Sequence, residues 1–186
     1  GTVNINNEDV KYLILDTYLF GYKIESAEGI FFPIIDYEVY QKYKEYLNED
    51  AKSFIDILTK ETSNIAIKDA ALLISYDEVF FRAINAETFL LKYPDFEGML
   101  KIDEVYKKYL ALTFYGTDNT PLFNYETLVM NQMAIDEYEK FVSNREYKDS
   151  NYKKLIKEFM NIVRKNSYKL TEEVDRFRYE KLSLKN

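Results

Sequence analysis

Apolar residues recur along most of this chain every three or four positions, the spacing that places side chains on one side of an α-helix. In the first such segment, Val10, Leu13, Ile14 and Tyr18 form a stripe that we expect to face a core. Residues 12–15 also fit a short buried strand, which stays open as an alternative. The spacing predicts helices over residues 8–20, 36–47, 50–60, 135–142 and 171–184, and further helices that start near residues 75, 103 and 150.

Polar residues mark the starts of most of these helices. A Ser, Thr, Asp or Asn at this position accepts a hydrogen bond from a free backbone N–H of the first turn. Ser75 and Glu78 fit the capping-box pattern, in which each side chain satisfies a backbone N–H near the other residue. The expected capping residues are Asn7, Asp36, Ser75, Asp103, Ser150 and Thr171.

Two short apolar runs near the N-terminus predict a β-hairpin. Residues 22–25 and 30–34 flank the sequence Ser-Ala-Glu-Gly, which reads as a turn with glycine at its close. Pro33 has no backbone N–H to donate, so we expect the second strand to be an edge strand or to end there.

The middle of the chain is expected to be helical with interruptions. Residues 67–74 are apolar and short, and residues 116–121 (Gly-Thr-Asp-Asn-Thr-Pro) have the composition of an exposed loop. Residues 122–125 and 127–130 fit either two short strands or extended segments. No internal repeat or linker is evident. The expected fold class is therefore mainly α (α+β), one compact helical domain over residues 1–186 with a small β-hairpin near the N-terminus.

Composition removes several classes of function. The chain has no Cys and no His, which excludes disulfides, thiolate zinc sites and histidine as a general base. A net charge of −7 argues against a nucleic-acid binder. The apolar stretches are far shorter than the ~20 residues that cross a bilayer. The first residues lack the pattern of a signal peptide, so we expect a cytosolic protein. We also expect that the protein needs no cofactor.

The candidates for hydrolytic or metal chemistry are three acidic clusters, at residues 77–78, 136–139 and 172–175, since paired carboxylates hold Mg²⁺ or divide acid and base roles. Each cluster falls at a predicted helix start, where negative charge is favoured by the helix dipole. We therefore interpret them as structural and expect no catalytic or metal-binding residues. A metal enzyme would need at least three of five of these acids to converge: Asp77, Glu78, Asp118, Asp136 and Glu137.

Two other patterns have a binding and a structural interpretation. Basic residues interleave with rings at residues 40–44, 106–109, 152–154 and 176–179, which resembles a platform for single-stranded nucleic acid. At helical spacing the rings fall on the core face instead, and the acidic net charge favours that interpretation. The 116–121 loop lacks the glycine pattern and the basic residue of phosphate-binding loops.

The order of the apolar segments resembles the small tail-assembly proteins of long-tailed phages and prophages of Gram-positive bacteria. The resemblance covers roughly residues 20–145 and consists of patterning and order, without an invariant motif. It implies a non-enzymatic chaperone that shields the tape-measure protein while the tail tube polymerises in the host bacterial cytosol. The segments that carry it are residues 30–35, 37–47, 74–81, 109–116, 127–131 and 134–141.

The last predicted helix has few apolar positions, which indicates a loosely docked tail or a partner-binding element. The leading hypothesis is a protein that binds another protein, because tyrosine is abundant (18 residues) and is enriched at interfaces. The alternatives are an acidic inhibitor of a host defence nuclease and a carboxylate enzyme with a divalent metal. The candidate partner-binding residues are Val174, Phe177, Tyr179 and Leu182.

Overall fold

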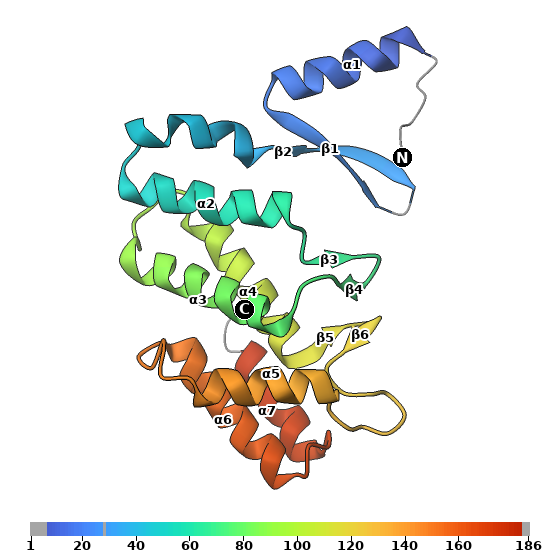
Figure 1. Ribbon diagram of the computed structural model, residues 1–186, viewed down its shortest axis with the longest axis vertical. Helices are drawn as coiled ribbons and strands as arrows, with labels where there is room; N and C mark the ends of the chain where they lie inside the picture. The colour runs from blue at the N-terminus through green and yellow to red at the C-terminus, as the bar shows by residue number, and fades with distance from the viewer. Residues whose placement is uncertain (1–6, 28, 184–186) are drawn as a thin grey trace. The chain divides into compact units, whose positions relative to one another are not determined.

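The computed structural model describes residues 7–27 and 29–183 (Figure 1). The chain divides into two compact units, unit 1 (Gly1–Ile65) and unit 2 (Ala66–Asn186), and each is described by itself. The fold is mainly α with small antiparallel hairpins, as the sequence predicts, and one hairpin lies near the N-terminus. The expectation of a single domain stays a prediction.

Unit 1 begins as the sequence predicts. Asn7 caps the first helix, and its Oδ1 accepts a 2.9 Å hydrogen bond from the Asp9 N–H. The predicted hairpin is confirmed, with Tyr22 opposite Ile35 and Ile24 opposite Pro33. Its second strand is an edge strand because the sheet has two strands. The elements are α1 (Glu8–Leu19), β1 (Tyr22–Ala27), β2 (Ile30–Ile35), η1 (Tyr37–Tyr46) and α2 (Glu49–Ser63).

The segment after Asp36 is a 3₁₀-helix and not the α-helix that the spacing suggests. Asp36 is its cap as predicted, accepting from the Glu38 N–H. η1 packs on α2 through an edge-on pair of the Tyr37 and Phe54 rings, 6.2 Å apart, and through polar contacts. Lys44 Nζ lies 2.6 Å from Asp56 Oδ1, and Gln41 Nε2 donates to Thr59 Oγ1 at 2.9 Å. These contacts hold the second half of unit 1 together.

Unit 2 contains five α-helices among its described residues and two very short hairpins. Residues 67–72, within the stretch expected to be helical with interruptions, form the first hairpin, because Asp69 and Ala70 take positive φ values that turn the chain back. The elements are β3 (Ile67–Lys68), β4 (Ala71–Leu72), α3 (Tyr76–Lys92), α4 (Met99–Tyr115), β5 (Gly116–Thr117), β6 (Thr120–Pro121), α5 (Gln132–Ser143), α6 (Asn151–Lys165) and α7 (Glu172–Ser183).

Some helix starts are confirmed and two are wrong. Ser75 and Ser150 each accept a bond from the third residue of their helix, as predicted. α4 begins at Met99 after Gly98, so Asp103 lies inside the helix, where it pairs with Lys107 at 3.2 Å. α5 begins three residues earlier than expected, because Asn131 supplies the cap. The segments around residues 123 and 130 form an isolated antiparallel bridge, which fits the extended alternative.

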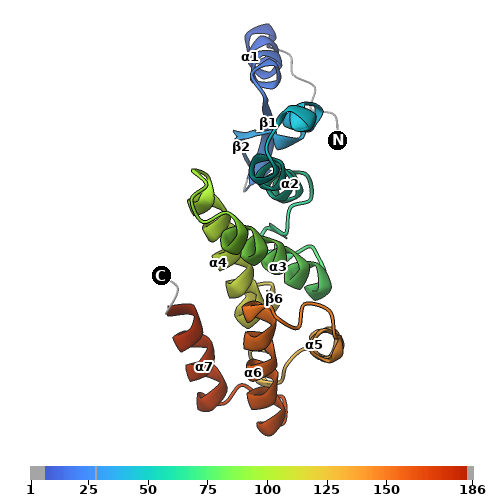
Figure 2. The same ribbon diagram turned by 90° about the vertical axis from the view of Figure 1, so that its left-hand side faces the viewer.

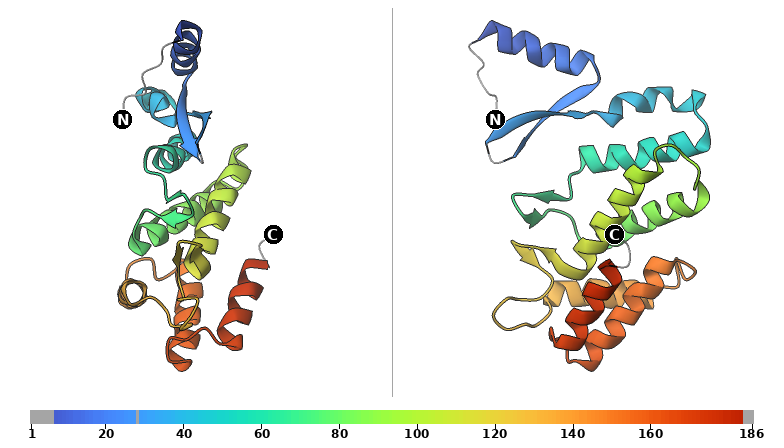
Figure 3. Two further views of the ribbon diagram at one scale, coloured as in Figure 1. Left: turned by 90° about the vertical axis from the view of Figure 1, so that its right-hand side faces the viewer. Right: turned by 180° about the vertical axis from the view of Figure 1, so that it is seen from behind.

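The core of unit 2 is built largely from aromatic rings. α3 and α4 form an extensive contact, and α5, α6 and α7 pack against them (Figures 2 and 3). Phe80 meets Tyr138 edge-on at 4.7 Å between centroids, and Phe114 meets Phe159 at 5.1 Å. Edge-to-face pairs add stabilisation to the burial of large rings. The many Tyr and Phe residues of unit 2 therefore form much of its interior.

In the part of the chain that the structure describes, no helix has both the length and the apolar character to span a lipid bilayer.

Candidate interaction surface

The acidic clusters hold helices in place. Asp77 and Glu78 lie in the first turn of α3, and Glu172 and Glu173 in the first turn of α7, as predicted. The cluster at residues 136–139 does not start its helix: it lies inside α5, so that interpretation is wrong. It is used between helices instead, because Glu139 pairs with Arg164 of α6.

The acidic side chains of the described residues do not converge on a point where a metal ion could bind. The Asp77 carboxylate lies 2.7 Å from Lys140 Nζ, and the Asp77 N–H donates to Glu137 at 3.2 Å, which joins α3 to α5. Glu78 accepts a 2.8 Å bond from Arg82. Over residues 7–27 and 29–183, no group of three or more acidic side chains is placed to hold a metal ion. The convergence that the metal-enzyme alternative requires is absent there.

Basic side chains beside the rings belong partly to the fold. Lys153 is buried, and its Nζ donates to the backbone oxygens of Asn144 and Glu146, at 2.5 and 2.6 Å. Burial lowers the pKa of Lys153. Arg178 is also buried, donates to the Phe114 carbonyl at 3.1 Å and lies over the Tyr115 ring. These two cations are therefore not displayed for a nucleic acid.

The fully buried tyrosines use their hydroxyls as hydrogen-bonding groups. Tyr138 donates to the Thr113 carbonyl, and the Tyr152 and Thr113 hydroxyls lie 2.6 Å apart. Burial raises the pKa of Tyr138 and Tyr152 well above the usual value. Both phenols stay neutral near pH 7, which suits structural links between α4, α5 and α6.

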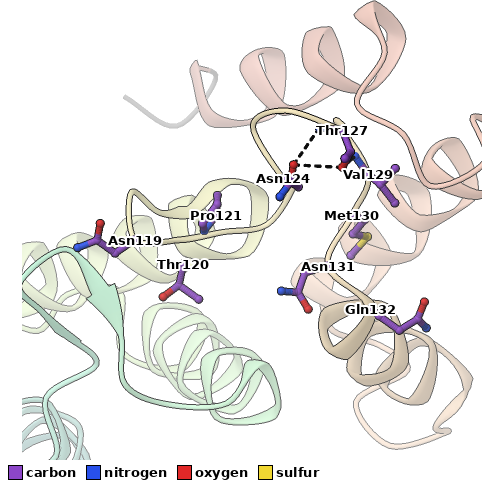
Figure 4. A pocket seen from close by; sticks show the side chains of 9 residues that line it. All are labelled: Asn119, Thr120, Pro121, Asn124, Thr127, Val129, Met130, Asn131 and Gln132. Carbon is purple, nitrogen blue, oxygen red and sulfur yellow. Dashed lines mark hydrogen bonds between the residues drawn. The ribbon is translucent and has the colours of Figure 1, made fainter.

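A shallow hollow of about 420 Å³ lies beside the turn that precedes α5 (Figure 4). Asn124 and Asn131 line it, and their Oδ1 atoms already accept backbone N–H bonds from Thr127 and Met133 at 2.8 and 3.0 Å. None of the lining side chains titrates near neutral pH, so the hollow is not a site for acid–base chemistry. Its lining residues are Asn119, Thr120, Pro121, Asn124, Thr127, Val129, Met130, Asn131 and Gln132.

The predicted partner-binding residues of the last helix divide into two groups. Val174 and Phe177 are buried, with Phe177 stacked 6.0 Å from Phe159, so these two form part of the core and do not face a partner. Together with Arg178 they contribute to the packing of α7 on α4 and α6. Tyr179 is 69% exposed and Leu182 is half-buried. Partner contact by these last two stays a prediction.

An exposed apolar surface that the sequence did not predict lies in unit 1. We call α1 and the β1–β2 hairpin, residues 8–27 and 29–35, the N-terminal arm. None of its described side chains is buried. The stripe of α1 expected to face a core is instead exposed or half-exposed, because no described element of unit 1 covers it. The exposed large apolar residues of the arm are Val10, Tyr12, Leu13, Leu15, Tyr18, Leu19, Phe20, Tyr22, Ile30, Phe31, Phe32 and Ile35.

Charge is divided unevenly between the units. Residues 1–65 contain 12 Asp and Glu against 6 Lys, a net charge of −6, whereas residues 66–186 contain 20 against 19, a net charge of −1. The chain's acidity is therefore concentrated in the unit that carries the exposed apolar arm. A sequence signal for the arm existed: Leu15 and Leu19 of α1 lie outside the apolar stripe, and a stripe-based interpretation overlooks them.

No protein-family model matches the chain, and neither the curated proteins nor the solved structures contain a match to it.

Proposed function

We propose that this chain is a non-enzymatic protein-binding protein whose N-terminal arm contacts the partner. The observation that carries the proposal is the exposure of large side chains in the arm, such as Leu19 at 82%, Phe20 at 77% and Phe31 at 65%. Many large apolar side chains exposed within one segment mark protein interaction sites. Aromatic side chains, of which the arm has several, are enriched in such contacts.

The tail-assembly chaperone remains the specific form of this proposal. A chaperone that shields a tape-measure protein needs an apolar surface to hold the shielded segment and needs no catalytic group. The exposed arm supplies such a surface, and the buried tyrosines Tyr138 and Tyr152 have structural roles. The resemblance in segment order over residues 20–145 supports the same assignment.

Co-purification tests the proposal. The full chain is mixed with a purified tape-measure fragment, and the mixture is separated by size. We expect co-elution with the wild type and its loss with Phe31→Asp, which puts a charge on the arm. Leu100→Asp in unit 2 is the matched control, because Leu100 is also exposed (71%). A fragment that never co-elutes, or binds all three proteins equally, counts against the chaperone assignment.

The acidity of unit 1 favours a second candidate, an inhibitor that occupies the basic groove of a defence nuclease. A net charge of −6 in residues 1–65 is suited to such a groove. Binding of this kind weakens steeply as salt rises, whereas apolar binding by the arm does not. Measuring the affinity of the chain for its partner at a low and a high salt concentration therefore separates the two candidates.

A further inference from the structure

The hollow beside α5 has a lining unlike the rest of this highly charged chain. None of its nine lining residues is charged, although 31% of the residues in the sequence are Asp, Glu, Lys or Arg. At that frequency roughly three of the nine would carry a charge. An anion, a cation or a nucleic acid is bound mainly through groups of opposite charge. The lining therefore suits a ligand without charge.

Two of the lining amides keep a free nitrogen in a fixed orientation. Asn124 Oδ1 accepts from the Thr127 N–H at 2.8 Å, and Asn131 Oδ1 accepts from the Met133 N–H at 3.0 Å. A backbone N–H can only donate, so the atom that it meets is the oxygen and the Nδ2 group lies on the other side. Figure 4 shows both nitrogens on the side of the hollow. Among the described residues, neither Nδ2 group has an acceptor.

Two further lining amides have the opposite arrangement. Asn119 Nδ2 donates to the Asp69 carbonyl at 2.8 Å, and Gln132 Nε2 donates to the Asp136 carboxylate at 3.0 Å. These partners can only accept, so the fold uses the nitrogen of each amide and leaves its oxygen. In the part of the chain that the structure describes, neither oxygen accepts a hydrogen bond. The hollow thus combines free donors and free acceptors, all of them uncharged.

A peptide main chain matches this combination. It carries no charge, and each residue has a C=O that accepts and an N–H that donates. In an extended segment these groups are not already paired with one another, as they are in a helix. Pro121, Val129 and Met130 line the same hollow and offer an apolar contact to a side chain of the segment. The volume of about 420 Å³ lies within the range of ligand pockets.

Other uncharged ligands find fewer complementary groups. A nucleobase stacks on aromatic rings, and the apolar face of a sugar ring commonly packs on one, but no aromatic side chain lines the hollow. We propose that this hollow is a second binding site, which holds an uncharged, extended segment of a partner protein through its main chain. The site lies in unit 2 and goes beyond the proposed function of the arm, on which it does not depend.

Nuclear magnetic resonance of the isotope-labelled full chain tests the proposal. The probe is a short peptide of Ala and Ser, acetylated and amidated so that it has no charge. Its addition is expected to shift the side-chain amide signals of Asn124 and Asn131. Because the hollow is shallow and each neutral hydrogen bond contributes modestly, we expect half-saturation on the order of 1 mM.

Two substitutions remove the donors and keep the caps. Asn124→Asp and Asn131→Asp retain an oxygen for the backbone N–H, because Asp caps as well as Asn does, and replace the nitrogen by an oxygen that repels a carbonyl. Each is expected to weaken peptide binding about 10-fold, followed through the amide signal of the other asparagine. Asn131→Ser, which caps without adding charge, should weaken it several-fold. Asn7→Asp adds the same charge at the cap of α1 and is expected to bind like the wild type.

Three outcomes would overturn the inference. The first is a peptide that shifts neither amide signal at concentrations on the order of 10 mM. The second is peptide binding by Asn124→Asp and Asn131→Asp that equals binding by Asn7→Asp. The third is an uncharged glucose oligomer that shifts the same signals at lower concentration than the peptide does. None of these outcomes bears on co-elution through Phe31, so the proposed function of the arm stands or fails by its own test.

Discussion

At the scale of single residues, Gly116 is the position where the fold of unit 2 tolerates no side chain. Its φ is +72°, and an added Cβ would lie 2.3 Å from the Thr120 carbonyl oxygen and 2.8 Å from the Leu122 nitrogen. Gly116→Ala is therefore expected to lower the free energy of unfolding by about 3 kcal/mol, through strain and displaced backbone. Urea unfolding measures the change. Gly98→Ala is the control, because φ is −82° there, and its effect is expected to be small.

Ala70 is a strained position where removal of the side chain is expected to stabilise the fold. It lies in the two-residue turn between β3 and β4 with φ +57°, a conformation that glycine adopts more easily than alanine. Ala70→Gly is expected to raise the free energy of unfolding by roughly 0.5 kcal/mol. Ala71→Gly, one residue later in β4, is expected to lower it by a similar amount. Thermal unfolding of the two variants compares them, and equal effects would contradict the argument.

At the scale of elements, a buried carboxylate joins α3 to the start of α6. Glu87 accepts a 2.6 Å bond from the Ser150 hydroxyl and a 2.8 Å bond from the Tyr152 N–H. Glu87→Ala leaves a buried N–H unpaired and is expected to cost about 2–3 kcal/mol in chemical denaturation. Glu104→Ala removes an exposed carboxylate from α4 and is expected to cost below about 0.5 kcal/mol. Equal costs would show that the Glu87 contacts do not stabilise the helix start.

The contact between α5 and α6 depends on pH. The hydrogen bond from Arg164 lowers the pKa of Glu139 below 4.5, and Tyr168 donates to the same carboxylate. Because the folded-state pKa is the lower one, this stability is present above the unfolded-state pKa and is lost as pH falls below about 4.5. Glu139→Gln is expected to flatten the loss of stability in that acidic range. Arg164→Gln should flatten it similarly, and the double variant should add little further, as measured by denaturation between pH 3 and 6.

Helix starts were predictable where the signal is local. Asn7, Ser75 and Ser150 cap their helices because a side chain and a backbone N–H within three residues are enough. The residues that dock α7 were not predictable from spacing. Arg178 bonds to the Phe114 carbonyl, 64 positions away in the chain, and sequence periodicity carries no information on such a partner. For that reason the burial of Val174 and Phe177 in the core could not be predicted, whereas partner contact by Tyr179 and Leu182 stays a prediction.

The candidate surface escaped prediction for a different physical reason. Periodicity tells which side of a helix is apolar, and it assumes that a core exists to cover that side. Leu13 and Tyr18 were expected to be covered on that assumption, yet they are 66% and 51% exposed. Another molecule can cover such a side, and the sequence of one chain carries no information on that molecule.

At the scale of the whole molecule, the two units are expected to differ in stability. In the described residues, every buried apolar side chain except Leu58 lies in unit 2, so unit 2 has a core of its own and unit 1 does not. A unit of 65 residues without a core is marginal in isolation. Unit 1 is therefore expected to unfold at a lower temperature than unit 2, which buries large apolar side chains in its own core.

Calorimetry of the full chain measures this difference. We expect two transitions, the one at lower temperature from unit 1 and the one at higher temperature from unit 2. Gly116→Ala should lower the higher midpoint and leave the lower one, which assigns the transitions. Leu19→Asp should leave the unit 2 midpoint unchanged, because Leu19 is 82% exposed and its loss removes no contact of that core. A single transition would show that the two units unfold together and would contradict the expectation.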